Sequence, residues 1–172
     1  MILDLPVSEI VTLTRGAARC DILPQLGGSI GTWSSNGQQM LRAVSTGGLA
    51  QRDPYATAGF PLVPFSNRIE VGRFVWDGKP VALARNFPPE PHAIHGVGFE
   101  RTWQVLSRAG DSALLALLHR PDAGWPWAFE ARQRITLTDD ALTLDLSAVN
   151  LEVQAVPLAF GHHPYMPRSG AR

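Results

Sequence analysis

The chain has 172 residues, with 15 Lys and Arg against 15 Asp and Glu, so its formal net charge is zero at pH 7. A generic binder of nucleic acids or anionic membranes needs a surplus of basic residues, so this balance excludes both classes. Apolar residues make up 45% of the chain, which is enough for a sizeable core and argues against disorder. The 16 Gly and 14 Pro indicate many turns.

From these residues we expect neither an export signal nor a membrane-spanning segment. Cys20 is the single cysteine and cannot form an internal disulfide. Residues 1–10 lack a basic start and include Asp4, Pro6 and Glu9, which is unlike a signal peptide. No apolar run approaches the ~18 residues of a transmembrane helix. We therefore expect a cytoplasmic protein, and residues 1–172 as one domain.

Short apolar runs bounded by turn residues predict strands along most of the chain. In chain order, the predicted strands are 10–14, 19–23, 29–34, 73–76, 79–83, 102–108, 113–119, 129–138 and 142–148. Asp77-Gly78 lies between two of them and favours a tight hairpin turn. No amphipathic helix of ordinary length is visible, although the leucines of 114–118 fit a helix or a buried strand equally well.

The clearest alternation spans 129–148. Phe129, Ala131, Ile135 and Leu137 share one face, whereas the residues of the opposite face are charged or Thr: Glu130, Arg132, Arg134, Thr136 and Thr138. The pattern resumes after Asp139-Asp140, which predicts an antiparallel hairpin with one solvated face. Many short strands at about ten-residue spacing indicate an all-β sandwich or barrel. The Gly- and Pro-rich stretches 47–67 and 86–99 interrupt this rhythm and are expected to be functional loops.

Four of the five histidines fall in two clusters, and an Asn-Arg pair lies upstream. The residues are His92 and His95, His162 and His163, and Asn67-Arg68. Loop histidines are commonly surface or capping residues, and Arg68 could pair with Glu70, Asp53 or Glu90. Zinc is the alternative, but no carboxylate or thiol has a familiar ligand spacing, so no metal site is expected.

The remaining motifs are less informative. Phosphate-binding glycine loops and the Gly-x-Ser-x-Gly nucleophile motif are absent from the sequence. Trp33, Trp76 and Trp103 lie in strand patterns and are expected in the core. Trp125-Pro126-Trp127 is the better candidate for an exposed aromatic platform.

Several motifs together resemble the aldose 1-epimerase (galactose mutarotase) family. They are Gly28 in Gly-Gly-Ser-Ile-Gly, residues 59–69 (Gly-Phe-Pro-Leu-Val-Pro-Phe-Ser-Asn-Arg-Ile), residues 72–78 (Gly-Arg-Phe-Val-Trp-Asp-Gly), Asn86, residues 92–96 (His-Ala-Ile-His-Gly) and His163-Pro-Tyr165. Asn-Arg-Ile alone is weak evidence, but this order and spacing over about 21–166 is specific. The resemblance implies a large antiparallel β-sandwich of the galactose-mutarotase-like supersandwich type, of which this chain is the N-terminal part.

The resemblance further implies an isomerase that interconverts the α and β anomers of a free monosaccharide, without metal or cofactor. His163 would be the acid at the ring oxygen. His95, also counted with the catalytic residues, and Arg68 would hydrogen-bond the sugar near that oxygen, and Asn67 would support a hydroxyl. His162 and His92 are second choices. Histidine suits the acid because its ordinary pKa lies near working pH.

The chain also departs from the family pattern. The family's general base is a glutamate well beyond the His-Pro-Tyr motif, and it is expected beyond Arg172. We therefore expect a domain truncated at its C-terminus, whose sandwich is completed by a missing segment or a second copy.

Two further functions stay open. One is a sugar-binding relative without the base. The other is a sugar-phosphate epimerase, for which Arg52 and Arg73 are the local basic candidates. The sequence does not identify the aldose.

Overall fold

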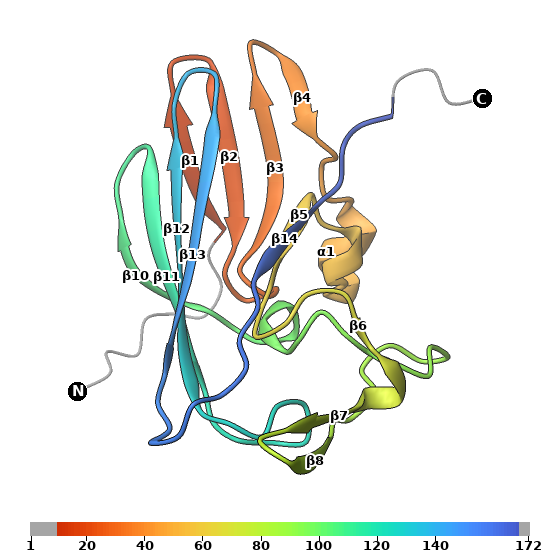
Figure 1. Ribbon diagram of the computed structural model, residues 1–172. Helices are drawn as coiled ribbons and strands as arrows, with labels where there is room; N and C mark the ends of the chain where they lie inside the picture. Colours follow the sequence, from red (N-terminus) through yellow and green to blue (C-terminus); the bar gives the residue numbers. More distant parts are fainter. Residues whose placement is uncertain (1–9, 169–172) are drawn as a thin grey trace.

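The computed structural model describes residues 10–168 and consists mainly of two antiparallel sheets (Figure 1). The first sheet has the order β1-β2-β3-β5-β14, and β4 also pairs with β3. Its strands are β1 (Val11–Arg15), β2 (Ala18–Leu23), β3 (Ser29–Ser35), β4 (Gln38–Leu41), β5 (Gly59–Leu62) and β14 (Gly161–Pro164). The expectations that concern residues 1–9 and 169–172 lie outside the described residues.

The second sheet has the order β10-β11-β12-β13, all antiparallel. Its strands are β10 (Gln104–Arg108), β11 (Ser112–His119), β12 (Phe129–Leu137) and β13 (Leu142–Asn150). The leucine-rich run of β11 is thus a strand. Every second residue of β12 is buried, from Phe129 to Leu137, as the alternation predicts. The outward residues of β13, including Thr143 and Asp145, are exposed and confirm the solvated face.

Two small ribbons lie at one end of the sandwich, and the helical segments are short (Figure 1). β6 (Arg68–Ile69) pairs with β9 (Ala93–Ile94), and β7 (Arg73–Trp76) pairs with β8 (Lys79–Ala82). The Asp77-Gly78 turn has φ of +48° and +70°, as the sequence predicts for a tight hairpin turn. The helical segments are α1 (Thr46–Gln51), η1 (Pro54–Ala56), η2 (Glu70–Gly72) and η3 (Gly98–Glu100).

The main core lies between the two sheets. Leu13 and Ile22 of the first sheet pack in one cluster with Leu115 and Ile135 of the second. Trp103 is buried there, as expected, but the expectation of an exposed platform at Trp125 is wrong. Trp125 is only 2% exposed, because its indole packs against Phe65 and Phe74.

A second, smaller cluster is aromatic and positions the candidate site. Phe60 of β5 and Phe99 of η3 are fully buried or nearly so, and Tyr55 and Tyr165 pack against them. Arg42 packs against this cluster and binds the backbone beside it. Its guanidinium lies 3.8 Å from the centre of the Tyr165 ring and donates to the carbonyl of Thr57 at 2.7 Å.

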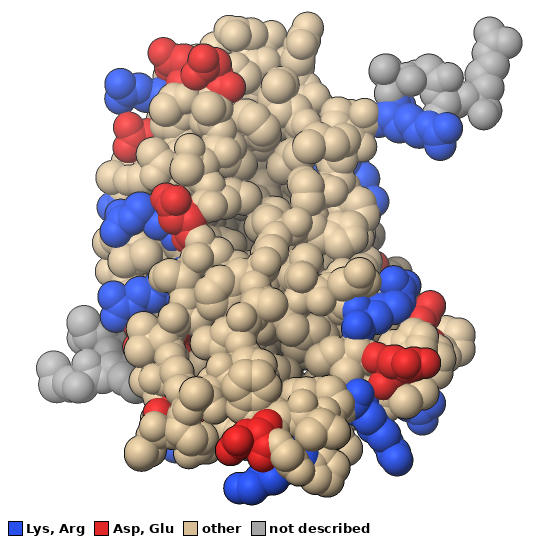
Figure 2. Space-filling view, in the orientation of Figure 1, with Lys and Arg blue, Asp and Glu red and all other residues tan. Residues whose placement is uncertain are grey.

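Acidic and basic side chains are scattered along the margins of the face in Figure 2, and the centre of this face carries none. The described residues contain no helix long and apolar enough to cross a membrane.

Candidate active site

The loop that carries His95 is tied to the segment that carries Asn67. β6 pairs with β9 through Arg68 and Ile94, and the backbone N–H of His95 donates to the carbonyl of Asn67 at 2.9 Å. In return, the backbone N–H of Asn67 donates to Nδ1 of His95 at 3.1 Å. Because Nδ1 accepts this bond, the neutral imidazole carries its proton on Nε2 and can donate from there.

β14 carries the second pair of histidines. His163 lies opposite Phe60 on β5, and His162 lies opposite Pro61. Since side chains alternate along a strand, the two imidazoles point to opposite faces. The His163 ring stacks on Phe60, with 5.1 Å between centroids and 22° between planes. His162 instead lies over Gly59, where a Cβ would be 2.8 Å from its Cε1.

His95 and His163 therefore meet over the aromatic cluster. Their ring centroids are 5.4 Å apart and their planes are inclined by 78°. Both contact Phe60, which has no exposed surface and supports the two rings from one side. Two imidazoles that come from distant parts of the chain thus share one rigid support.

Arg68 lies near His95, close enough for its charge to lower the pKa of that imidazole. Its Nε is 3.4 Å from Oε2 of Glu90, and the Arg68 side chain is 47% exposed. An ion pair this exposed is weak. Within residues 10–168, neither terminal nitrogen of Arg68 has a protein partner, so both can donate to a ligand. Of the three carboxylates considered from the sequence, Glu90 is the partner.

Burial, with smaller contributions from the nearby His163 and Arg68, lowers the pKa of His95 to about 4. His95 is therefore neutral at pH 7 and acts as a hydrogen-bond donor there. Burial, with a smaller contribution from His163, also lowers the pKa of His162 to about 4. The Nδ1 atom of His163 is buried without a partner in the described residues, which leaves Nε2 to exchange a proton with a ligand.

The other candidates lie elsewhere. Nδ1 of His92 accepts the backbone N–H of Val71 at 3.1 Å, which fits the capping interpretation. Arg52 donates to the carbonyl of Gln25 at 2.9 Å, and Arg73 lines a separate groove with Arg85. Within residues 10–168, no group of three His, Cys, Asp or Glu residues is arranged to hold a metal ion.

The sequence alone indicates no role for Phe60, Tyr165 or Asn86. Phe60 and Tyr165 form the support of the histidine pair, with 4.7 Å between the rings of His163 and Tyr165. Both residues lie inside the motifs quoted above, so the sequence did point to the segments that carry them. Their contact with the imidazoles depends on the pairing of β5 with β14, which no local pattern predicts. The catalytic and binding roles of His163, His95, Arg68 and Asn67 stay a prediction.

Comparison with known proteins extends these observations. The family profile described as aldose 1-epimerase matches residues 9–171. YphB of Escherichia coli (strain K12), described as uncharacterized, is 35% identical over 160 residues, which is 93% of this chain and 52% of YphB. YihR of the same organism, also uncharacterized, is 29% identical over 114 residues, which is 66% of this chain and 37% of YihR.

Solved structures agree with the fold. One from Escherichia coli K12 superposes with a TM-score of 0.85 at 33% identity, covering 94% of this chain and 53% of that one. A GalM/aldose epimerase homologue from C. elegans has a TM-score of 0.75 at 20% identity, covering 95% and 52%.

The chain spans about half the length of YphB and of these two solved structures. Within that half, it has the galactose-mutarotase-like β-sandwich fold expected from the sequence. The family profile covers nearly all of it, from residue 9 to residue 171. The chain therefore belongs to the aldose 1-epimerase family.

Proposed function

We propose that this chain supplies the acid and the sugar-orienting groups of a mutarotase site, which interconverts the α and β anomers of a free aldose. The observation that carries the proposal is the juxtaposition of His95 and His163, 5.4 Å apart on Phe60, with the weakly paired Arg68 beside them. One imidazole can transfer a proton while the other, with the guanidinium, binds the same oxygen.

Ring opening requires two coupled proton transfers. A base removes the proton from the anomeric hydroxyl, and the electron pair of that O–H bond forms the C1 carbonyl. The bond between C1 and the ring oxygen breaks, and the ring oxygen takes a proton from Nε2 of His163. After rotation about the C1–C2 bond, the same steps run in reverse on the other face of the carbonyl, and His163 recovers its proton.

The other three residues stabilise this transition. Nε2–H of His95 and the terminal N–H groups of Arg68 donate to the ring oxygen while negative charge develops on it. A neutral His95 suits this role, because it donates without competing for the proton that His163 transfers. Asn67 directly precedes Arg68 and is proposed to bind a sugar hydroxyl. No metal or cofactor is needed for these steps.

The base is the part that the described residues do not supply. Within residues 10–168, no carboxylate forms a hydrogen bond or ion pair with His95 or His163. From the resemblance, we expect the base to be a glutamate in a region of the family that this chain does not cover. The second candidate is a sugar-binding relative that orients an aldose through His95 and the weakly paired Arg68 without accelerating exchange. Completion of the sandwich by further polypeptide or a second copy belongs to the same proposal.

NMR exchange between the anomers of an aldose, measured on the intact protein, tests the proposal. His163→Ala should lower the catalysed rate by about 10²–10⁴-fold, the usual contribution of a general acid, and His95→Ala by a smaller factor. His162→Ala is the matched control, because it removes the adjacent imidazole on the opposite face of β14. A full rate in His163→Ala would refute the acid assignment, and saturable binding without acceleration in the unmodified protein would favour the binder.

A further inference from the structure

The side chain of Asn86 makes three hydrogen bonds to the backbone on both sides of His95. Its Nδ2 donates to the carbonyl of Ile94 at 2.8 Å and to the carbonyl of Gly96 at 3.1 Å. Its Oδ1 accepts the backbone N–H of Ile94 at 2.9 Å. One side-chain amide thus forms hydrogen bonds to the residue before His95 and to the residue after it.

The backbone of residues 94–96, which Asn86 binds, is strained at His95. His95 has φ of +62°, in the left-handed region that is unfavourable for a residue with a side chain. Such a conformation persists only where its surroundings enforce it. On one side, the carbonyl of Val63 accepts the N–H groups of Val97 and Gly98, both at 2.9 Å. Asn86 provides the restraint at the residues that flank His95.

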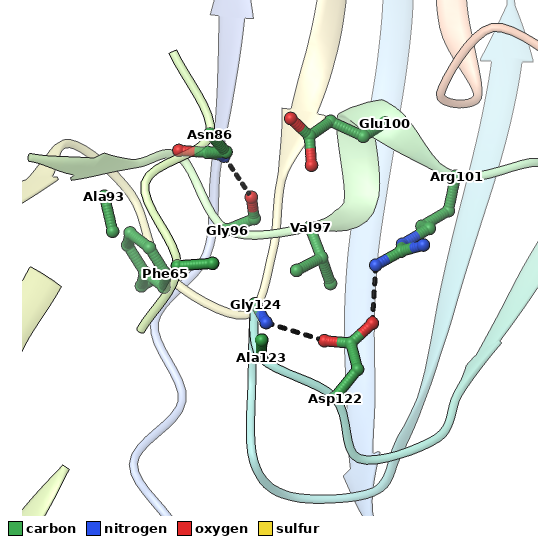
Figure 3. A pocket seen from close by; sticks show the side chains of 11 residues that line it. Phe65, Asn86, Ala93, Gly96, Val97, Glu100, Arg101, Asp122, Ala123 and Gly124 are labelled. Atoms are coloured by element: carbon green, nitrogen blue, oxygen red, sulfur yellow. Dashed lines mark hydrogen bonds and ion pairs between the residues drawn. The ribbon is translucent and has the colours of Figure 1, made fainter. Parts of the chain in front are cut away.

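Packing alone does not restrain this side of the loop. Asn86, Ala93, Gly96 and Val97 line a cavity of about 270 Å³, which continues to Glu100, Arg101 and Asp122 (Figure 3). Neither His95 nor His163 lines this cavity. The loop therefore has the candidate site next to His95 and a cavity along its backbone. Here directional hydrogen bonds from Asn86 replace the close packing that fixes backbones elsewhere.

We infer that Asn86 is a positioning residue for His95: it holds the 94–96 backbone so that Nδ1 of His95 meets the N–H of Asn67 and Nε2–H is presented to the sugar. This inference rests on the proposed function for its consequence in catalysis, but the geometry that it assigns can be measured without any sugar.

An amide is the side chain that fits this position. It offers two donors and one acceptor on one small planar group, and all three are used here. Asp would keep the acceptor for Ile94 N–H but place a carboxylate against two carbonyl oxygens. Ala would remove all three bonds and leave buried backbone groups of the loop unsatisfied, a cost that favours rearrangement.

The test compares Asn86→Ala with Asn150→Ala in the intact protein. Asn150 is a matched control, because its side chain also bridges backbone groups, donating to Gln154 at 2.7 Å and accepting from Glu152 at 2.9 Å. Nitrogen-15 NMR of the imidazole reports which nitrogen carries the proton. The unmodified protein and Asn150→Ala should show His95 protonated on Nε2, and Asn86→Ala should show a mixture of both tautomers.

Anomer exchange provides the second readout. If the proposed function holds, Asn86→Ala should lower kcat by about 10- to 100-fold, as a misplaced orienting group does, with little change in KM. An unchanged His95 tautomer in Asn86→Ala overturns the inference, and so does an equal change in both variants. If Asn86→Ala does not fold, Asn86→Asp takes its place, with the same tautomer mixture expected and an unchanged tautomer again refuting the inference. Loss of the fixed tautomer without any exchange activity in the unmodified protein refutes the proposed function alone.

Discussion

Replacement of Gly96 by Ala tests how tightly the His95 loop is held against β5 and its extension. Gly96 has φ of +76°, and a Cβ there would lie 2.2 Å from the carbonyl oxygen of Val63 and 2.7 Å from the nitrogen of Pro64. All these neighbours are backbone atoms, so no side-chain rotation relieves the contact. The loop must move away from Val63 by about 1 Å to restore van der Waals distance.

The cost follows from what this movement breaks. The Val63 carbonyl accepts the N–H groups of Val97 and Gly98, both at 2.9 Å, and each bond contributes about 1 kcal/mol. Alanine at positive φ adds roughly 1–2 kcal/mol. We therefore expect Gly96→Ala to lower the free energy of unfolding by about 3–4 kcal/mol.

Gly78→Ala is the matched control. Gly78 has φ of +70°, but nothing lies within 4 Å of its added Cβ, so this variant should lose only the backbone contribution of about 1–2 kcal/mol. Urea unfolding followed by the fluorescence of the five tryptophans gives both values. If Gly96→Ala is no less stable than Gly78→Ala, the contact with Val63 does not hold the loop and the reasoning fails.

Two further predictions concern buried titratable groups. The pKa of about 4 for His162 and His95, against 6.5 for a free histidine, means that the unfolded chain binds more protons between these values. Their contribution to the free energy of unfolding is therefore fully present above about pH 6.5 and is lost as the pH falls toward 4. The loss is at most about 1.4 kcal/mol per pH unit for each histidine, and it is smaller for the partly exposed His95. Urea midpoints from pH 7 to 4 should fall less steeply in His162→Gln, and an equal slope would contradict this. Burial, and secondarily Asp21, raises the pKa of Cys20 to about 12. A thiol reagent at pH 8 should thus leave Cys20 unmodified until urea is added, and labelling of the folded protein would disprove the assignment.

Local patterns predicted the strands whose neighbours follow in sequence. β12 and β13 alternate with period two and pair through a short turn, and the Asp77-Gly78 turn fixes β7 against β8. β4 was missed because Gln38 and Gln39 are exposed and carry no apolar signal. Its turn was nevertheless visible as Asn36-Gly37, where both residues have positive φ.

The strands that build the site were missed for a different reason. β5 contains Gly59 and Pro61, residues that are depleted in strands, so residues 47–67 were expected to form a loop. Its partner β14 is only four residues long and lies near the other end of the chain. Motif resemblance therefore identified the histidines, but their distance and their support by Phe60 follow from a pairing that is not local.

The register of the short β14 strand determines which of its two histidines lies on Phe60. A slip by one residue against β5 would turn every side chain to the opposite face, and His162 would then replace His163 on the Phe60 side. Because the two histidines are adjacent, either register would place an imidazole on the Phe60 side. On the opposite face, Gly59 leaves room for an imidazole, because the His162 ring occupies the space that a Cβ would fill. A larger residue at position 59 would therefore displace the His162 ring and the β14 backbone, and with them the place of His163 over Phe60.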